Sequence, residues 1–231
     1  SVWVDFDRSL EAYWSFDNCN ETGCFDDSTH DHFGHFIGDL GLWDQVTGKR
    51  GKALTVDGGH VVLGDSSEFN YTNTTSFTIG LWVRNNQRLY SGVGSKSILY
   101  KFSWSLGGYN IYYHNSGRWQ SCLRNGTTYR CLYHGATVPK MTWTHLGMRY
   151  DAESRNYSFF VNGDRKRMTT LPLGYGGFDV DRSLYVEPFN GAVDEIIIFN
   201  RSLADDEMAS IYNAKVNDYH KNFTQLSTGV H

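Results

Sequence analysis

The stretch from Ala192 to Tyr212 constrains the fold of this chain most strongly, because it predicts a buried strand followed by a helix. Ile196–Phe199 is a β-branched, apolar run entered through the acidic pair Asp194–Glu195, and such a run is typical of a strand covered on both faces. Ser202 and Asp205 are spaced as a weak capping box. The apolar stripe of the helix consists of Leu203, Met208, Ile211 and Tyr212.

The rest of the chain is predicted to consist almost wholly of strands. In Phe77–Arg84 apolar residues alternate with Thr78, Gly80, Trp82 and Arg84, which is the period of a half-buried strand. Many short strands at even spacing indicate a two-sheet antiparallel sandwich. The other predicted strands are Tyr13–Asp17, Ala53–Val56, His60–Leu63, Ile98–Phe102, Tyr109–Tyr113, Trp119–Leu123, Tyr129–Tyr133, Trp143–Tyr150, Tyr157–Val161, Leu184–Val186 and Val193–Phe199.

Three further motifs, YWSFD at 13–17, GKALTVDGGHVVL at 51–63 and SFTIGLWVR at 76–84, join the strand and helix at 192–212 in one pattern. Together they resemble the laminin-G-like jelly rolls of the concanavalin A-like lectin/glucanase superfamily, over roughly Glu11 to Asn213. The resemblance implies a jelly-roll sandwich with one short C-terminal helix. We therefore expect a single domain over 11–214, an N-terminal edge strand or linker at 1–10, and a polar tail at 215–231.

Charge and hydropathy exclude some partners and favour an extracellular protein. The formal net charge is -4 and no basic block occurs, which argues against nucleic acid as a partner. No apolar run approaches the ~20 residues that cross a bilayer, so we expect no membrane insertion within this chain. Because the sequence begins at Ser1 without a signal peptide, we expect a mature or trimmed ectodomain, secreted or on a cell, viral or filament surface.

Glycosylation sequons and paired cysteines support that location. Four cysteines allow three connectivities, and proximity favours the local pairs Cys19–Cys24 and Cys122–Cys131. A hairpin with Asn125–Thr128 as its loop would place Cys122 opposite Cys131, and neither spacing matches a standard zinc site. The seven Asn-X-Ser/Thr sequons begin at Asn20, Asn70, Asn73, Asn125, Asn156, Asn200 and Asn222.

Acidic residues near the first and last strands predict a structural calcium site. In laminin-G-like jelly rolls these strands lie close together, so the resemblance implies that Asp17 approaches Asp194. Asp26 and Asp27 begin a DDS sequence that matches the acidic loop after the first strand of that family. Carboxylates and carbonyls are the ligands that calcium prefers, so the four aspartates are the candidate ligands. A transition-metal site in the HDHFGH run at 30–35 is a minor alternative.

A sugar-binding site requires exposed aromatic faces beside hydrogen-bonding groups, and the segment 90–133 is rich in both. Alternation assigns Tyr109, Ile111 and Tyr113 to the core and leaves Tyr112 on the opposite face. Most aromatic residues here are expected to pack in the core or in cross-strand pairs. The candidate ligand-binding residues are Trp104, Tyr112 and Trp119.

Catalysis has little support in the sequence. Glycosidases need two carboxylates that flank one glycosidic bond, whereas strand alternation predicts that Asp194 and Glu195 face opposite sides of the sheet. The chain is therefore predicted to be a non-catalytic binding or adhesion module for glycan or protein ligands. The alternative is a structural building block that self-associates through strand edges, including Val2–Phe6; a glycoside-active enzyme domain is a weaker alternative.

Overall fold

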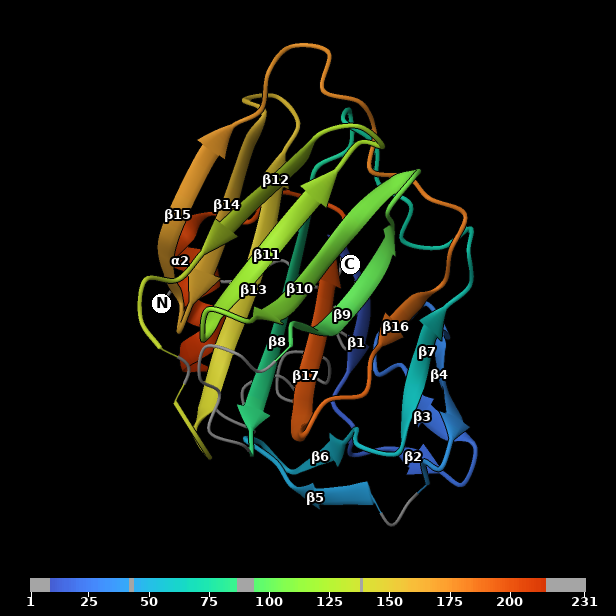
Figure 1. Ribbon diagram of the computed structural model, residues 1–231. Coiled ribbons are helices and arrows are strands. Elements are labelled where there is room, and N and C mark those ends of the chain that lie inside the picture. The colour runs from blue at the N-terminus through green and yellow to red at the C-terminus, as the bar shows by residue number, and fades with distance from the viewer. Residues whose placement is uncertain (1–8, 42–43, 87–93, 138, 215–231) are drawn as a thin grey trace, which may run out of the picture.

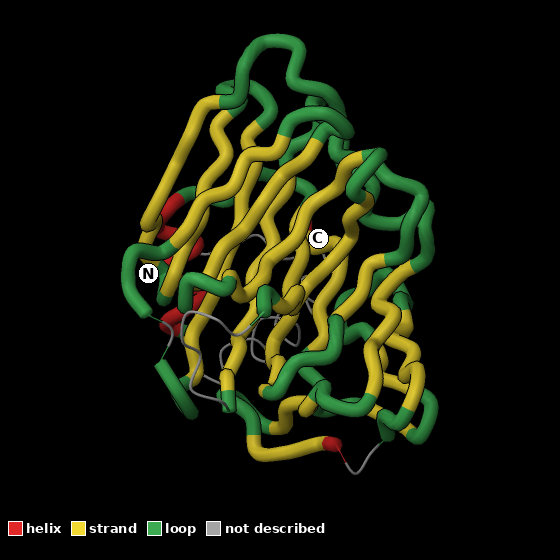
Figure 2. The backbone as a smooth tube through the Cα atoms, viewed as in Figure 1, coloured by secondary structure: helices red, strands yellow, loops and turns green. Residues whose placement is uncertain are grey.

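Two antiparallel β-sheets packed face to face make up the computed structural model of the chain, which describes residues 9–41, 44–86, 94–137 and 139–214. Figure 1 shows the two layers, and Figure 2 shows that loops join the strands at both ends of the sandwich. The predicted all-β jelly-roll sandwich of the concanavalin A-like type is confirmed. No helix of the described ranges is long and apolar enough to span a membrane.

The rear layer in Figure 1 is an eight-stranded sheet with the order β15-β14-β13-β8-β17-β6-β5, and β1 pairs with β17 beside this path. Its strands are β1 (Leu10–Trp14), β5 (Gln45–Thr47), β6 (Lys52–Thr55), β8 (Phe77–Asn85), β13 (Trp143–Asp151), β14 (Asn156–Val161), β15 (Asp164–Thr170) and β17 (Gly191–Phe199).

The front layer is a nine-stranded sheet with the order β12-β11-β10-β9-β16-β7-β4-β3-β2. Its strands are β2 (Cys19–Asn20), β3 (Gly23–Phe25), β4 (Phe33–Gly38), β7 (Gly59–Gly64), β9 (Lys96–Ser103), β10 (Gly107–His114), β11 (Arg118–Arg124), β12 (Tyr129–Tyr133) and β16 (Leu184–Val186).

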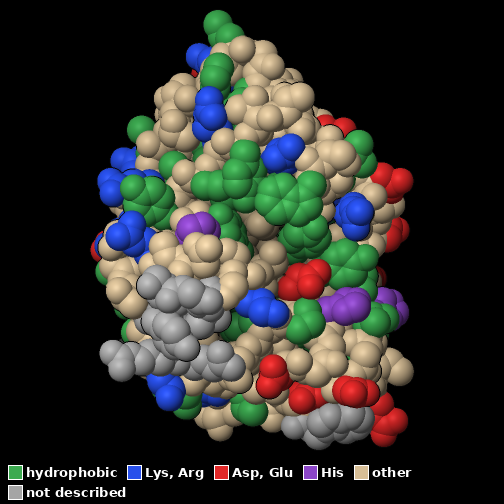
Figure 3. Space-filling view, in the orientation of Figure 1, with side chains coloured by type: hydrophobic (Ala, Val, Ile, Leu, Met, Phe, Trp, Pro, Cys, Tyr) green, Lys and Arg blue, Asp and Glu red, His purple; other side chains and the backbone are tan. Residues whose placement is uncertain are grey.

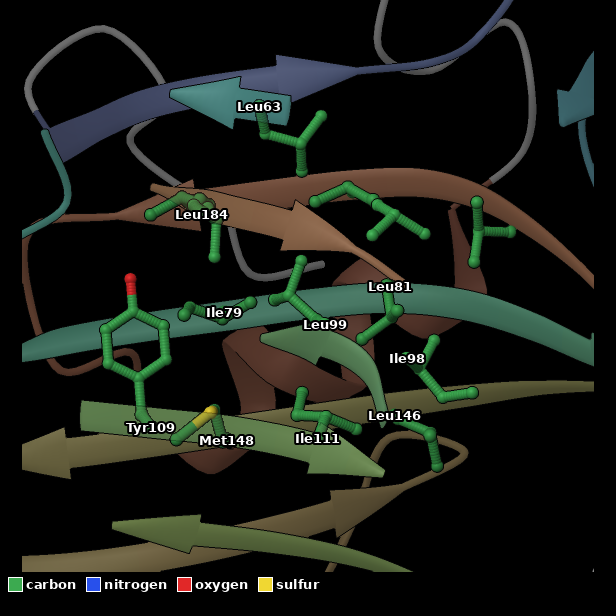
Figure 4. Close-up of a cluster of buried hydrophobic side chains, with 14 of the residues drawn as sticks. Leu63, Ile79, Leu81, Ile98, Leu99, Tyr109, Ile111, Leu146, Met148 and Leu184 are labelled. Atoms are coloured by element: carbon green, nitrogen blue, oxygen red, sulfur yellow. The ribbon is translucent and has the colours of Figure 1, made fainter. Parts of the chain in front are cut away.

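The hydrophobic core lies between the sheets, where alternate residues of the central strands point inward. Ile79 and Leu81 of β8 face Leu99 of β9 and Ile111 of β10 across the sandwich (Figure 4), and all four are fully buried. The predicted alternation of Phe77–Arg84 is confirmed, because the apolar set of this strand belongs to the core.

Strand β17 is buried along its whole length because it carries apolar side chains on both faces. Ile196 and Ile198 belong to the core between the sheets, whereas Ile197 and Phe199 pack against helix α2 (Asp205–Asn213) on the outer face. Fully burying one such side chain contributes roughly 1.5–3 kcal/mol. The strand covered on both faces and the late helix are therefore confirmed.

The helix begins two residues later than the predicted capping box requires. Ala204 is the N-cap residue, and its N–H donates to Oε2 of Glu207 at 2.7 Å. The capping box predicted from Ser202 and Asp205 was therefore wrong. Glu207 accepts the N–H of Ala204 instead, and Arg201 holds the Glu207 carboxylate at 2.6 Å.

Some strand boundaries also differ from the predictions. The first strand is Leu10–Trp14 instead of Tyr13–Asp17, since the left-handed φ of 60° at Phe16 does not continue an extended strand. The short strands β2 to β5 were not predicted as strands. The predicted edge strand Val2–Phe6, the tail 215–231 and Asn222 lie outside the described residues.

Both predicted local disulfides are present. Cys19–Cys24 joins β2 to β3, and Cys122–Cys131 joins β11 to β12, each between residues directly opposite in the sheet. The loop of the second hairpin closes as expected, because Asn125 N donates to Thr128 O at 3.2 Å.

Candidate functional site

The outer face of the nine-stranded sheet carries an aromatic group that we call the Trp104 cluster, which consists of the exposed Trp104, the half-buried Arg124 and Tyr129, and the buried Phe102. Trp104 is 70% exposed, and its ring lies 5.3 Å from that of Phe102 in an edge-to-face arrangement and 6.1 Å from that of Tyr129. The Arg124 guanidinium lies 5.8 Å from the centroid of Trp104 and 6.0 Å from that of Tyr129. Such contacts orient the Trp104 ring while leaving it open to solvent.

Tight turn geometry holds Trp104 in this place. The turn between β9 and β10 ends at Gly107 and Gly108, which have φ values of 140° and 114°. A Cβ on Gly108 would lie 2.2 Å from the carbonyl oxygen of Lys101. Only glycine therefore allows β10 to return this close to β9, and the turn that carries Trp104 projects from the end of the hairpin.

A polar network lies beside the cluster on the same face. The Tyr112 hydroxyl donates to Oε1 of Gln120 at 2.6 Å and lies 3.6 Å from Sγ of Cys122. Burial raises the pKa of the Tyr129 hydroxyl, although hydrogen bonds with the side chains of Tyr112 and Asn110 lower it. Oδ1 of the buried Asn110 has no hydrogen-bond partner among the described residues. The network fixes the surface beside the aromatic rings.

Figure 3 looks onto this face of the molecule. Hydrophobic side chains gather in its middle, and Lys and Arg side chains lie around them. Of the three predicted ligand-binding residues, the structure exposes only Trp104 extensively. Tyr112 is 8% exposed and Trp119 is 1% exposed.

The prediction for Trp119 was wrong because this side chain belongs to the core face of β11. It is Tyr113's cross-strand partner, and the two rings meet edge to face at 6.2 Å inside the sandwich. A residue at this depth cannot contact a ligand on the surface.

A pocket of about 560 Å³ adjoins the cluster on the far side of the same turn. Lys101, which is buried, holds two walls of the pocket together: its Nζ donates to Ser66 O at 3.2 Å and also to Arg182 O. Burial lowers the pKa of Lys101 to about 8. The residues that line the pocket are Ser66, Ser67, Asn70, Leu106, Asp179, Val180 and Asp181.

Asp26 and Asp27, two of the predicted calcium ligands, have taken structural roles. Oδ1 of Asp26 accepts from Tyr13 N at 2.8 Å, and Oδ2 of Asp27 accepts from both the N–H and the hydroxyl of Ser15. Burial raises the pKa of the Asp27 carboxyl, and its bonds to Ser15 lower it. The two carboxylates thus fasten the loop after β3 to β1.

Asp17 and Asp194, the other two predicted ligands, lie at the turn between β5 and β6. Oδ1 of Asp17 accepts from Lys52 N at 2.6 Å, and Oδ2 of Asp194 accepts from Lys49 N at 2.7 Å and from Arg50 N at 3.0 Å. All four aspartates thus accept structural hydrogen bonds, and the described residues contain no group of three or more His, Cys, Asp or Glu side chains that could hold a metal ion. The geometry does not fit the four-carboxylate calcium site.

The pair Asp194–Glu195 does not alternate across the sheet as predicted. Asp194 lies opposite Trp82 and Ile197 opposite Gly80, so β17 contains an extra residue here, and Glu195 has a φ of 52°. This β-bulge turns both carboxylates toward Arg50, whose guanidinium donates to Oε2 of Glu195 at 2.8 Å. The sequence signal for it was the adjacency of two acidic residues in an apolar strand.

Burial decides what these two carboxylates can do. Burial, together with a smaller contribution from the neighbouring Glu195 carboxylate, raises the pKa of Asp194 to about 9. Burial also raises the pKa of Glu195, while Arg50 lowers it. Both side chains lie inside the molecule, so they cannot flank a glycosidic bond of a bound polysaccharide.

The histidines of the HDHFGH run remain near one another without forming a metal site within the described ranges. The His30 and His32 rings stack at 6.2 Å, and Nδ1 of His32 lies 2.6 Å from Oε1 of Glu68. The sequons of the described residues are all at least partly exposed, so a glycan is sterically compatible with each of them. These sequons begin at Asn20, Asn70, Asn73, Asn125, Asn156 and Asn200.

Several solved structures that superpose on this chain are binding domains of toxins. The binding domain of Paraclostridial Mosquitocidal Protein 1 superposes with a TM-score of 0.74 at 14% identity, covering 90% of this chain and 53% of that one. The receptor-binding domain of botulinum neurotoxin mosaic serotype C/D gives 0.73 at 12% identity, covering 90% and 51%. The ligand-binding domain of botulinum neurotoxin serotype D, in complex with N-acetylneuraminic acid, gives 0.68 at 13% identity, covering 88% and 50%.

This chain therefore spans about half the length of those structures, and at such identities the likeness shows the fold. No curated protein matches the sequence. The family model described as concanavalin A-like lectin/glucanases superfamily (Laminin_G_3) matches residues 55–209, which is more than half of the chain. The chain therefore belongs to the Laminin_G_3 family of the concanavalin A-like lectin/glucanases superfamily.

Proposed function

We propose that the chain is a non-catalytic extracellular module that binds glycans through the Trp104 cluster. The observation that carries the proposal is the Trp104 ring, which is 70% exposed yet held by Phe102, Tyr129 and Arg124. Sugars present apolar C–H faces, and an exposed ring of fixed orientation provides the surface on which such a face packs.

The surroundings of the cluster supply the polar groups that a sugar also needs. Arg124 has no carboxylate partner among the described residues, so its guanidinium has donors available for hydroxyl or carboxylate oxygens. The pocket beyond Leu106 presents serine hydroxyls, an asparagine and two aspartates. An oligosaccharide packed on Trp104 could extend one residue into this pocket.

The comparisons support a binding role without assigning a ligand. The structural neighbours are described as binding domains, and one was solved with N-acetylneuraminic acid. The two disulfides are compatible with an oxidising, extracellular environment. The buried positions of Asp194 and Glu195 agree with a module that does not hydrolyse its ligand.

A glycan array tests the proposal when the wild-type chain is compared with Trp104→Ala and Leu173→Ala. Leu173 is 84% exposed and provides a matched control for the loss of an exposed apolar side chain. We expect Trp104→Ala to lose most of the binding to the preferred glycans and Leu173→Ala to retain it. Equal binding by all three proteins would refute the proposed site, and a wild-type chain that binds no glycan would refute the proposed function.

A further inference from the structure

Three Asn-Gly pairs occur in the chain, at 125–126, 162–163 and 190–191. In such a pair the main-chain nitrogen of glycine can attack Cγ of the asparagine, because glycine has no side chain that hinders the approach. The structure places the pairs in the turn between β11 and β12, in the turn between β14 and β15, and at the start of β17 (Figure 1). Their surroundings differ, so their reactivity should differ although the two reacting residues are the same.

The reaction joins the glycine nitrogen to Cγ of asparagine in a cyclic succinimide. As this bond forms, the glycine nitrogen loses its proton, and the side-chain Nδ2 takes up a proton and leaves as ammonia. Water then opens the ring at one of its two carbonyl carbons. One opening gives aspartate, and the other gives isoaspartate, whose side-chain methylene has become part of the main chain.

The Asn125 side chain is held in a position that favours this attack. Its Oδ1 accepts from Thr128 N at 2.7 Å, from Thr127 N at 3.3 Å and from Thr127 Oγ1 at 3.4 Å. Negative charge develops on Oδ1 when Cγ is attacked, and donors already aimed at that atom stabilise the charge. The turn thus provides donors at the oxygen that needs them.

The two nitrogen atoms that must react are free at this turn. Among the described residues, neither Nδ2 of Asn125 nor the main-chain N of Gly126 makes a hydrogen bond. Gly126 lies between the paired strands and has a left-handed φ of 88°. No hydrogen bond of the sheet therefore has to break before the nitrogen can approach Cγ.

The pair Asn162–Gly163 is protected on both reacting sides. Oδ1 of Asn162 accepts from His145 N at 3.0 Å, which ties the side chain to the neighbouring strand β13. Gly163 is buried beneath helix α2, since a Cβ on it would lie 3.0 Å from Cβ of Tyr212. Attack would require the asparagine to leave β13 and the glycine to move against the helix.

The pair Asn190–Gly191 is protected by the sheet. Gly191 is the first residue of β17, where it lies opposite Asn85 of β8, and it is buried. A Cβ on Gly191 would lie 2.5 Å from the carbonyl oxygen of Arg84. The start of the strand would have to detach before this nitrogen could reach the asparagine side chain.

We propose that Asn125 is a site of spontaneous deamidation and isoaspartate formation in the folded chain, and that Asn162 and Asn190 are not. Asn125 also begins a glycosylation sequon. Glycosylation uses the same Nδ2 that deamidation releases, so the two modifications compete for one atom.

Isoaspartate at this position should disturb the Trp104 cluster. Arg124 of the cluster donates from Nη2 to Gly126 O at 2.9 Å, and Asn125 N donates to Thr128 O at 3.2 Å across the turn. An additional methylene in the main chain between these atoms changes both distances. This consequence rests on the proposed glycan site, whereas the modification itself does not.

Peptide mass spectrometry tests the modification, using the full chain from a host that attaches no N-glycans. During incubation at physiological pH, we expect Asn125 to convert at least about tenfold faster than Asn162 and Asn190, because only its turn leaves the reacting atoms free. In the urea-unfolded chain the three pairs should convert at similar rates. Equal rates in the folded chain, or an intact Asn125 in a folded chain whose unfolded form converts, would overturn the proposal.

Glycan binding before and after the incubation tests the consequence, with Asn125→Gln as the matched control. This variant keeps a side-chain amide but would have to close a larger ring, so it should not convert at this position. We expect the incubated wild-type chain to lose binding in proportion to its isoaspartate content and the incubated variant to retain it. Unchanged binding by a largely converted wild-type chain would overturn the link to the Trp104 cluster while leaving the modification site in place.

Discussion

Replacing Arg50 with methionine should destabilise the fold more than any change of an exposed residue. The Arg50 and Glu195 side chains are only 4% and 6% exposed, and their charged atoms lie 2.8 Å apart. The same guanidinium donates to Ile211 O at 2.9 Å and to Ala214 O at 2.6 Å, at the end of α2. Arg50 thus joins the turn before β6, the bulge of β17 and the C-terminal end of the helix.

The size of the effect follows from the charge that remains. Arg50→Met leaves Glu195 buried without its cation, and breaking a buried ion pair in this way costs about 3–5 kcal/mol. For a domain of this size, each kcal/mol lowers the melting temperature by roughly 2–4 °C. We therefore expect the melting temperature to fall by about 6–20 °C.

Denaturant unfolding of a double-mutant cycle measures this coupling. Glu195→Gln should lower the free energy of unfolding less in the Arg50→Met background than in the wild-type chain, because in that background the substitution leaves no buried charge unpaired. Arg130→Met is the matched control, since Arg130 is exposed and should change stability by no more than about 0.5 kcal/mol. Additive costs in the cycle, or a loss below about 1 kcal/mol for Arg50→Met, would refute the role assigned to the pair.

Three other predictions concern the acidic residues and the sequons. Because burial raises the pKa of Asp194 to about 9, its stabilising contribution is complete below the unfolded pKa of about 4 and is lost as the pH rises toward 9. The unfolding free energy of the wild-type chain should therefore fall relative to that of Asp194→Asn between pH 5 and pH 9, and parallel pH profiles would contradict this. Since the described residues contain no group of acidic, histidine or cysteine side chains that could hold a metal ion, we expect the same melting temperature with chelator and with added calcium; a calcium-dependent rise would restore the site predicted from the sequence. In a glycosylating host, Asn73 and Asn125 should carry glycans, and an unchanged intact mass after enzymatic deglycosylation would exclude this.

The fold was predictable where one physical rule acts locally. The alternation in Phe77–Arg84 assigned the inward face of β8, and the spacing of Cys122 and Cys131 around a short turn gave both the hairpin and its disulfide. Both features depend on residues close together in the sequence, so the sequence pattern alone is enough to predict them.

The site was less predictable because it depends on departures from regular geometry. The bulge at Glu195 reverses the face expected from alternation. The buried Glu195 carboxylate is neutralised by Arg50, which lies 145 residues away in the sequence. Trp119 and Trp104 are equally aromatic in the sequence, yet the first points into the core and the second lies in a turn beyond the end of β9. Which aromatic ring is exposed follows from strand register and turn position.

The indole N–H signals of the tryptophans give the most direct test of the proposed binding face. Trp104 is 70% exposed, whereas Trp14, Trp82 and Trp119 are at most 2% exposed, so one ¹H–¹⁵N spectrum distinguishes a ligand on the Trp104 cluster from one bound elsewhere. On titration with the strongest glycan from the array, we predict that the Trp104 signal shifts in a saturable manner while the signals of the three buried tryptophans remain in place. Saturable binding that leaves the Trp104 signal unmoved would contradict the account.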